Sequence, residues 1–138
     1  MKDNCIFCKI IDGQIPSDTI FEDEDFKVIM DISPAARGHA IILPKKHSAN
    51  LFELDDETAA KALIVARKVA LAMRAELKFE GVNLLQNNGT AAGQTVFHFH
   101  MHLIPRFTED QVEITWLQGK YADGESAKIA EAIGKRIE

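Results

Sequence analysis

Three histidines alternate with apolar residues in one short segment of the chain. His98, His100 and His102 occupy every second position of the run Val-Phe-His-Phe-His-Met-His-Leu-Ile, residues 96–104. Successive side chains of a β-strand point to opposite faces, so this alternation predicts a strand that buries the apolar residues and presents three imidazoles on its other face. In a helix the same side chains would point in every direction around the axis, which favours the strand.

Two kinds of chemistry suit three imidazoles in a row. Side chains on one face of a strand are about 6.6 Å apart, which puts the outer pair roughly 13 Å apart. Because a zinc–nitrogen bond measures only about 2.1 Å, two neighbouring histidines could bind one ion but all three could not. A neutral imidazole can also attack phosphorus and form a covalent nucleotidyl intermediate, while a neighbouring histidine protonates the leaving group. A metal on an end histidine would leave the central His100 free for this role.

The loop before the histidine segment has the composition of an anion site. Asn87, Thr95 and the residues between them are small or carry amide and hydroxyl groups. Gly93 permits a close approach of the backbone, and neighbouring N–H groups could form a concave anion site. Such a loop is ordinary by itself, but its direct connection to the histidine segment favours a phosphate site.

Cys5 and Cys8 have the spacing of half a zinc site. The chain has no second cysteine pair, so a tetrahedral site would have to recruit some of its five histidines. The alternatives are a redox dithiol and two ordinary thiols. A redox motif normally opens a helix that follows a strand, whereas this pair lies near the start of the chain. The spacing does not say which histidines would join the cysteines.

Several regular elements are expected to position these residues. The apolar patterns predict a hairpin within 19–31, a buried strand over 39–43, a strand over 82–85 and a short helix over 126–137. A long helix should begin after Asp55 or Asp56 and end near Gly81. Its expected apolar face consists of Leu63, Ala66, Ala70, Met73 and Leu77. These elements predict an α+β fold in which the long helix packs on an antiparallel sheet of about five strands.

Length and charge restrict the class of protein. A chain of 138 residues fits one domain, 1–138. Its net charge of −5 argues against a nucleic acid partner. The sequence has no secretory signal and no apolar stretch near the roughly 20 residues that a membrane span requires. We therefore expect a cytoplasmic protein without a membrane partner.

The motifs together resemble one known family. The run from His98 to Ile104 matches the His-φ-His-φ-His-φ-φ signature of the histidine triad (HIT) superfamily of nucleotide hydrolases and transferases, where φ is apolar. The further matching motifs are Cys-Ile-Phe-Cys-Lys-Ile-Ile from Cys5, Asp-Ile-Ser-Pro from Asp31, Gly38-His39, Pro-Lys-Lys-His ending at His47, and Asn-Gly followed by Ala-Gly-Gln-Thr. The chain looks like the Hint branch, the nucleoside phosphoramidases, in its zinc-bearing bacterial form. The resemblance covers residues 5–106 and is weaker over 107–138.

The resemblance implies a role for each matching position. His100 matches the nucleophile that becomes nucleotidylated, His102 the histidine that contacts the phosphate, and His39 a supporting histidine. The implied nucleotide-binding positions are Phe7, Ile10, Ile15, Asp31, Ile32, Asn87, Gly93, Thr95 and His102. The implied ligands of a structural zinc ion are Cys5, Cys8, His47 and His98.

The resemblance also implies an activity and an assembly. The expected protein is a homodimer that hydrolyses nucleoside 5′-phosphoramidates or related adenylates, with a purine nucleotide of the AMP or GMP type as its ligand. Two alternatives stay open, namely a dinucleoside polyphosphate hydrolase of the same fold and a nucleotide-binding scaffold protein.

Overall fold

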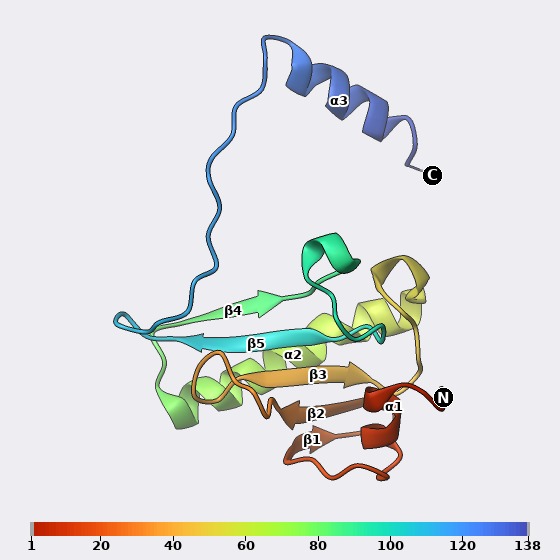
Figure 1. Ribbon diagram of the computed structural model, residues 1–138, viewed down its shortest axis with the longest axis vertical. Helices are drawn as coiled ribbons and strands as arrows, with labels where there is room; N and C mark the ends of the chain where they lie inside the picture. The colour runs from red at the N-terminus through yellow and green to blue at the C-terminus, as the bar shows by residue number, and fades with distance from the viewer. Residues whose placement is uncertain (1, 138) are drawn as a thin grey trace.

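The chain forms one antiparallel sheet with helices on both faces (Figure 1). The computed structural model describes residues 2–137. The sheet order is β1-β2-β3-β5-β4, with β1 (Thr19–Glu22), β2 (Phe26–Met30), β3 (Ala40–Pro44), β4 (Gly81–Leu85) and β5 (Met101–Arg106). The helices are α1 (Ile6–Ile11), α2 (Asp56–Leu77) and α3 (Glu125–Gly134), with 3-10 turns η1 (Leu51–Glu53) and η2 (Thr90–Ala92). The expected α+β fold with a five-stranded antiparallel sheet is confirmed.

The long helix α2 begins at a side-chain cap. The Asp55 carboxylate accepts a hydrogen bond of 2.8 Å from the backbone N–H of Thr58, so Asp55 rather than Asp56 is the N-cap. Asp56 and Glu57 add negative charge to the first turn, where it interacts favourably with the helix dipole. The helix ends at Leu77, and its C-cap Lys78 adopts the left-handed conformation with φ 54°.

The face of α2 that packs on the sheet differs from the expected one. The buried residues are Ala62, Val65, Ala66, Val69 and Met73. Ala66 and Met73 were expected there, and Ala70 and Leu77 are partly buried at the margin of this face. The prediction that Leu63 packs on the sheet is wrong, because Leu63 is 61% exposed. The helix carries two overlapping apolar stripes, and the small side chains of Ala62 and Ala66 let it approach the sheet along the one that includes them.

The opposite face of the sheet carries α1. Alternation along β2 directs Val28 toward α2 and Ile29 toward α1, and β3 does the same with Ile42 and Ile41. The core on the α1 side consists of Cys5, Phe7, Cys8, Ile10, Ile29, Ile41 and Leu43. The cysteine pair and the histidine segment meet on this side.

The strand predicted over 96–104 is shorter than expected. β5 begins only at Met101, and its ladder with β3 ends at the pair Ile42↔Met101. The preceding segment turns toward the loop after β3, where the N–H of Phe99 donates to the Ser48 carbonyl at 2.7 Å. The expectation of three exposed imidazoles on a strand face is therefore wrong, since His98 and His100 precede the strand and are buried. The apolar side chains between the histidines are also buried.

One glycine is required where the loop before β3 touches α2. Gly38 has φ +93°, and a Cβ there would lie 2.3 Å from Leu77 Cδ1. We expect Gly38→Ala to lower the free energy of unfolding by roughly 2–4 kcal/mol, because backbone strain and overpacking add. Denaturant unfolding measures this, with Gly13→Ala as the control because Gly13 has φ +82° and no atom within 4 Å of its Cβ position. Equal losses in the two variants would contradict a role for the Leu77 contact.

The C-terminal part of the chain leaves the sheet after β5. The Arg106 guanidinium pairs with Asp110 at 2.8 Å and donates to the Val112 carbonyl at 2.8 Å, which fixes the start of this segment. An extended stretch then leads to α3, which lies apart from the rest of the molecule (Figure 1). Within residues 2–137 no helix combines the length and the apolar character needed to cross a membrane.

Candidate functional site

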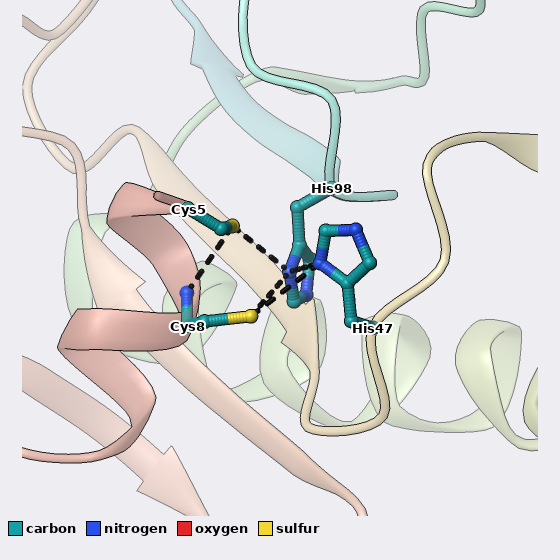
Figure 2. Close-up of side chains that lie close together, drawn as sticks. All are labelled: Cys5, Cys8, His47 and His98. Carbon is teal, nitrogen blue, oxygen red and sulfur yellow. Dashed lines mark hydrogen bonds between the residues drawn. The ribbon is translucent and has the colours of Figure 1, made fainter. Parts of the chain in front are cut away.

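Two cysteines and two histidines converge beside α1 (Figure 2). Cys5 caps the start of α1 and Cys8 lies within it, while His47 lies in the loop after β3 and His98 precedes β5. The Nδ1 atom of His98 lies 3.5 Å from both sulfur atoms and 3.0 Å from His47 Nδ1. The Cys8 sulfur lies 3.4 Å from His47 Nδ1. The structure thus brings the four expected metal ligands together.

The four donor atoms fit a tetrahedral metal ion. His98 donates its Nε2 proton to the Pro44 carbonyl at 2.8 Å, which leaves the Nδ1 lone pair facing the cysteines. Zinc bonds of about 2.3 Å to sulfur and 2.1 Å to nitrogen give tetrahedral edges of roughly 3.4–3.8 Å. Four of the six separations between the donor atoms are 3.0–3.5 Å, slightly shorter than these edges or equal to them, and all six are within 4.8 Å. The cluster could therefore hold one zinc ion after small shifts of its side chains.

The hydrogen bonds of His100 define its tautomer. Its Nδ1 lies 2.7 Å from the His98 carbonyl oxygen, which only accepts, so Nδ1 carries the proton. Its Nε2 therefore has a free lone pair when the ring is neutral. The ring packs edge-on against Phe7, with centroids 4.9 Å apart. Burial lowers the pKa of His100 and keeps the imidazole neutral at pH 7.

The tautomers of His39 and His102 follow from a chain of hydrogen bonds. The backbone N–H of Ala35 donates to His39 Nδ1 at 2.9 Å, so the neutral His39 ring carries its proton on Nε2. This Nε2–H donates to His102 Nδ1 at 2.8 Å, which leaves the His102 proton on its own Nε2. The His102 and His100 rings have centroids 5.0 Å apart. A lone pair and an N–H donor are thus placed on adjacent imidazoles.

One cleft of about 550 Å³ opens over these rings. This volume suits a ligand the size of a nucleotide. The expected residues that line it are Phe7, Ile10, Ile15, Asp31, Ile32, His39, Asn87, Gly93, Thr95, His100 and His102. Every position expected for catalysis or nucleotide binding therefore lies on the same cleft, while the cysteine cluster lies beside it.

Similarity to known proteins identifies the family of this chain. The HIT domain matches residues 12–109 of this chain. The chain belongs to the HIT family. Protein hit of Bacillus subtilis is 42% identical to this HIT protein over 138 residues, covering 98% of this chain and 95% of that one. Adenosine 5′-monophosphoramidase hnt1 of Schizosaccharomyces pombe is 37% identical over 135 residues, covering 97% and 98%.

Solved structures of the same family share the fold. A HIT family protein from Bacillus anthracis superposes with a TM-score of 0.93 at 44% identity, covering 100% of both chains. A Zn-bound histidine triad family protein from Mycobacterium smegmatis superposes with a TM-score of 0.76 at 36% identity, covering 96% of this chain and 98% of that one. The resemblance to the histidine triad family is thereby confirmed.

The carboxylate of Asp31 in this HIT protein has two partners. One oxygen accepts a hydrogen bond of 2.7 Å from the backbone N–H of Ser33, and the other lies 3.5 Å from His39 Nε2. The first contact forms the turn before Pro34, and the second places the carboxylate beside the histidine chain. The Asp31 side chain can therefore form the turn and line the cleft at the same time.

Sequence reasoning missed the buried glutamine that holds the small-residue loop. The Gln94 side chain accepts a hydrogen bond from the Gly89 N–H at 2.8 Å and donates to the Ala49 carbonyl at 2.7 Å and the Val96 carbonyl at 3.1 Å. These bonds fix the η2 turn and the entry to the histidine segment. An exposed-looking polar residue between Gly93 and Thr95 gave no periodic signal that it would be buried.

Neutral histidines make the stability of the HIT domain depend on pH. Burial lowers the pKa of His39 and His100 and brings that of His102 to about 4. The pKa of an unfolded histidine is about 6.5, so the unfolded chain binds more protons below that pH, and the free energy of unfolding falls as the pH drops from about 7 toward 4. Urea unfolding at several pH values measures this fall. His102→Gln should flatten it, and parallel curves for the two proteins would contradict the assignment.

Proposed function

We propose that this HIT protein hydrolyses nucleoside 5′-phosphoramidates or related adenylates at the α-phosphate through a covalent nucleotidyl-histidine. The observation that carries this proposal is the pair of tautomers, with a free Nε2 lone pair on His100 and an N–H on the adjacent His102. Family membership supports nucleotide hydrolysis in general, and a relative named adenosine 5′-monophosphoramidase supports the narrower substrate class.

The reaction consists of two displacements at phosphorus. In the first, His100 Nε2 forms a bond to the α-phosphorus while the bond to the amine breaks, and the amine leaves with a proton taken from solvent. The charge that develops on the imidazole is stabilised by its Nδ1–H, which donates to the His98 carbonyl. In the second, water attacks phosphorus, the bond to His100 breaks, and a proton returns to solvent. His102 donates its N–H to a phosphate oxygen and so stabilises the developing charge in both steps.

The residues that line the cleft support separate positions for the base, the ribose and the α-phosphate of a nucleotide. We assign the base to the apolar side chains of Phe7, Ile10, Ile15 and Ile32, and the ribose hydroxyls to Asp31. The α-phosphate is assigned to Asn87, Gly93 and Thr95, where Gly93 has φ +90° and its Cβ position lies 3.5 Å from Asn87 Nδ2. These donors suit an anionic ligand even though the chain carries a net charge of −5.

The cysteine cluster is proposed to hold a structural zinc ion. The ligands are Cys5, Cys8, His47 and His98, whose donor atoms all lie within 4.8 Å of one another. A Zn-bound family member supports the choice of metal. Bound zinc would supply a rigid connection between α1, the loop after β3 and the segment before β5, and would leave His100 free for catalysis.

The edge strand β4 supports a homodimer in which two sheets run together. The other edge strand, β1, is protected by a bulge between Thr19 and Phe21 and by the charged Glu22. β4 has no charged residue, and Val82 and Leu84 expose apolar side chains on one of its faces. Antiparallel pairing of two β4 strands would satisfy the open edge of both copies.

A comparison of two substrates tests the proposed reaction. An AMP-amine conjugate and a dinucleoside polyphosphate are given separately to the same preparation, and we expect the conjugate to be turned over faster, with kcat/KM higher by about 10-fold or more. Mass spectrometry after rapid acid quenching should detect one AMP group on His100. Faster cleavage of the polyphosphate would favour the dinucleoside hydrolase instead, and absence of turnover with both would favour a nucleotide-binding scaffold.

A further inference from the structure

The loop that connects β2 to β3, here called the β2–β3 loop, consists of residues 31–39 (Figure 1). It begins at Asp31 and ends at His39, and the Asp31 N–H donates a hydrogen bond of 2.9 Å to the His39 carbonyl. The His39 N–H donates to the Ala36 carbonyl at 3.0 Å. These bonds close the loop at its base, so that Asp31 and His39 hold a fixed position relative to each other.

The carboxylate of Asp31 is held beside His39 and cannot rotate away freely. One of its oxygens accepts the Ser33 N–H at 2.7 Å, which leaves the other oxygen 3.5 Å from His39 Nε2. The Asp31 side chain is 17% exposed. Among residues 2–137 no lysine or arginine forms an ion pair with it. Its negative charge therefore acts on His39 and on a ligand in the cleft.

The Nε2 proton of His39 lies near two acceptors. It is donated to His102 Nδ1 at 2.8 Å, and the Asp31 oxygen at 3.5 Å is the second acceptor. The contact with Asp31 is longer than a normal hydrogen bond and acts through charge. Burial lowers the pKa of His39 and the charge of Asp31 opposes this shift, so the two groups interact. The carboxylate thus attracts the proton away from the line to His102 and weakens that hydrogen bond.

The strength of this hydrogen bond affects the far side of the His102 ring. Hydrogen bonds in a chain polarise one another, so an imidazole that accepts a stronger bond at Nδ1 becomes a better donor at Nε2. The Nε2–H of His102 is the donor that the proposed reaction places on a phosphate oxygen. A weaker bond from His39 therefore means weaker stabilisation of the charge that develops on phosphate.

We propose that the ribose hydroxyls of the substrate act on catalysis through Asp31, in addition to any binding energy that they supply. When they donate to the carboxylate, they compensate its charge, and the His39 proton is then directed to His102. Without them, the uncompensated carboxylate weakens the hydrogen-bond chain and also repels the charged phosphate. Asp31 is thereby a positioning residue that makes the rate of reaction depend on the sugar. This inference rests on the proposed function and specifies how that site selects its substrate.

A substrate without ribose hydroxyls tests this dependence on the sugar. The AMP-amine conjugate and its 2′,3′-dideoxy form are given separately to the unchanged protein. We expect kcat to be lower by about 10-fold for the dideoxy form, because part of the contribution of the His102 donor is lost. A loss confined to KM, with equal kcat for the two substrates, would show that the hydroxyls supply binding energy only and would overturn the proposal.

Asp31→Asn should reverse part of this loss. The asparagine oxygen can still accept the Ser33 N–H, but the charge beside His39 is removed. We expect kcat with the dideoxy substrate to rise by several-fold above that of the unchanged protein, and the two substrates to agree in kcat within about 2-fold. Ser33→Ala is the control, since Ser33 is exposed and the substitution keeps its backbone N–H. It should retain the 10-fold difference, and the same difference in Asp31→Asn would overturn the proposal.

Proton NMR of the unchanged protein tests the coupling without turnover. The proton between His39 Nε2 and His102 Nδ1 is assigned by ¹⁵N labelling of histidine, and its shift is followed on addition of AMP or 2′,3′-dideoxy-AMP. We expect AMP to move it further downfield, as a stronger hydrogen bond requires. Equal shifts with the two saturating ligands would overturn the coupling. Absence of turnover with the AMP-amine conjugate would contradict the proposed function, and the NMR shifts would still decide whether Asp31 couples the ribose to His102.

Discussion

Replacement of His100 by alanine should lower turnover of an AMP-amine conjugate by about 10⁴-fold, because the imidazole lone pair proposed to attack phosphorus is removed. The His98 carbonyl holds the proton of His100 on Nδ1 and thereby leaves Nε2 free. Neither His102 nor His39 can replace it, since each Nε2 carries a proton in the hydrogen-bond chain that begins at Ala35. The expected defect is therefore in kcat, while binding of AMP stays within a few-fold of the unchanged protein.

Three measurements separate loss of the nucleophile from loss of structure. Circular dichroism and the unfolding midpoint report whether the variant folds, and calorimetry reports whether it still binds AMP. His39→Gln is the comparison variant, because it disturbs the hydrogen-bond chain to His102 and leaves His100 intact. We expect it to lower turnover by only about 10–100-fold. Turnover by a folded His100→Ala protein near the level of the unchanged protein would disprove the covalent mechanism.

The sequence allowed the participants of the site to be predicted better than their geometry. Alternation of His98, His100 and His102 correctly predicted that these residues lie close together, since the rings of His100 and His102 have centroids 5.0 Å apart and His100 Nδ1 lies 2.7 Å from the His98 carbonyl oxygen. The predicted strand was too long, because the period of two persists through the bend at residues 96–98. After this bend Phe99 bonds to Ser48 instead of continuing the ladder. The alternation of residue types predicts which side chains lie on the same face, but it does not predict where the backbone hydrogen bonds between strands end.

The face of α2 that packs on the sheet was also predicted only in part. α2 carries two stripes of apolar residues, one that packs on the sheet and one that is exposed. Because the two stripes overlap in the sequence, the apolar period of the helix predicts a face that lies between them. The predicted face combined Ala66 and Met73 from the core with Leu63 from the exposed stripe. The helix predicted over 126–137 is present as α3, but its packing could not be predicted, because Ile129 and Ile133 have the pattern of a core-facing helix although no residue of α3 is buried.

Substitution of Cys8 by serine should remove the metal and lower the stability of the whole domain. The unchanged protein is expected to contain about one zinc ion per chain, and the variant almost none, because serine is a poor ligand for zinc. Loss of the ion uncouples α1, the loop at His47 and the segment at His98, and we expect the melting temperature to fall by about 10 °C or more. Elemental analysis and calorimetry on dialysed protein measure the two effects.

Turnover should fall together with the metal, and the contacts of His98 explain why. This residue directs Nδ1 to the cysteines and Nε2 to the Pro44 carbonyl, while its own carbonyl accepts the Nδ1 proton of His100. Phe7, which lies between the two cysteines in sequence, packs against His100 from the other side. Loss of the metal therefore removes the restraint on both groups that hold the nucleophile.

Ser48→Ala is the matched control for the cysteine variant. Ser48 follows His47, and its hydroxyl is buried with no hydrogen-bond partner among the described residues. Its removal deletes one polar atom next to the cluster without deleting a ligand, so metal content should stay the same and stability should change by less than about 1 kcal/mol. A Cys8→Ser protein that retains one zinc ion and the melting temperature of the Ser48→Ala protein would show that the cysteines are ordinary buried thiols.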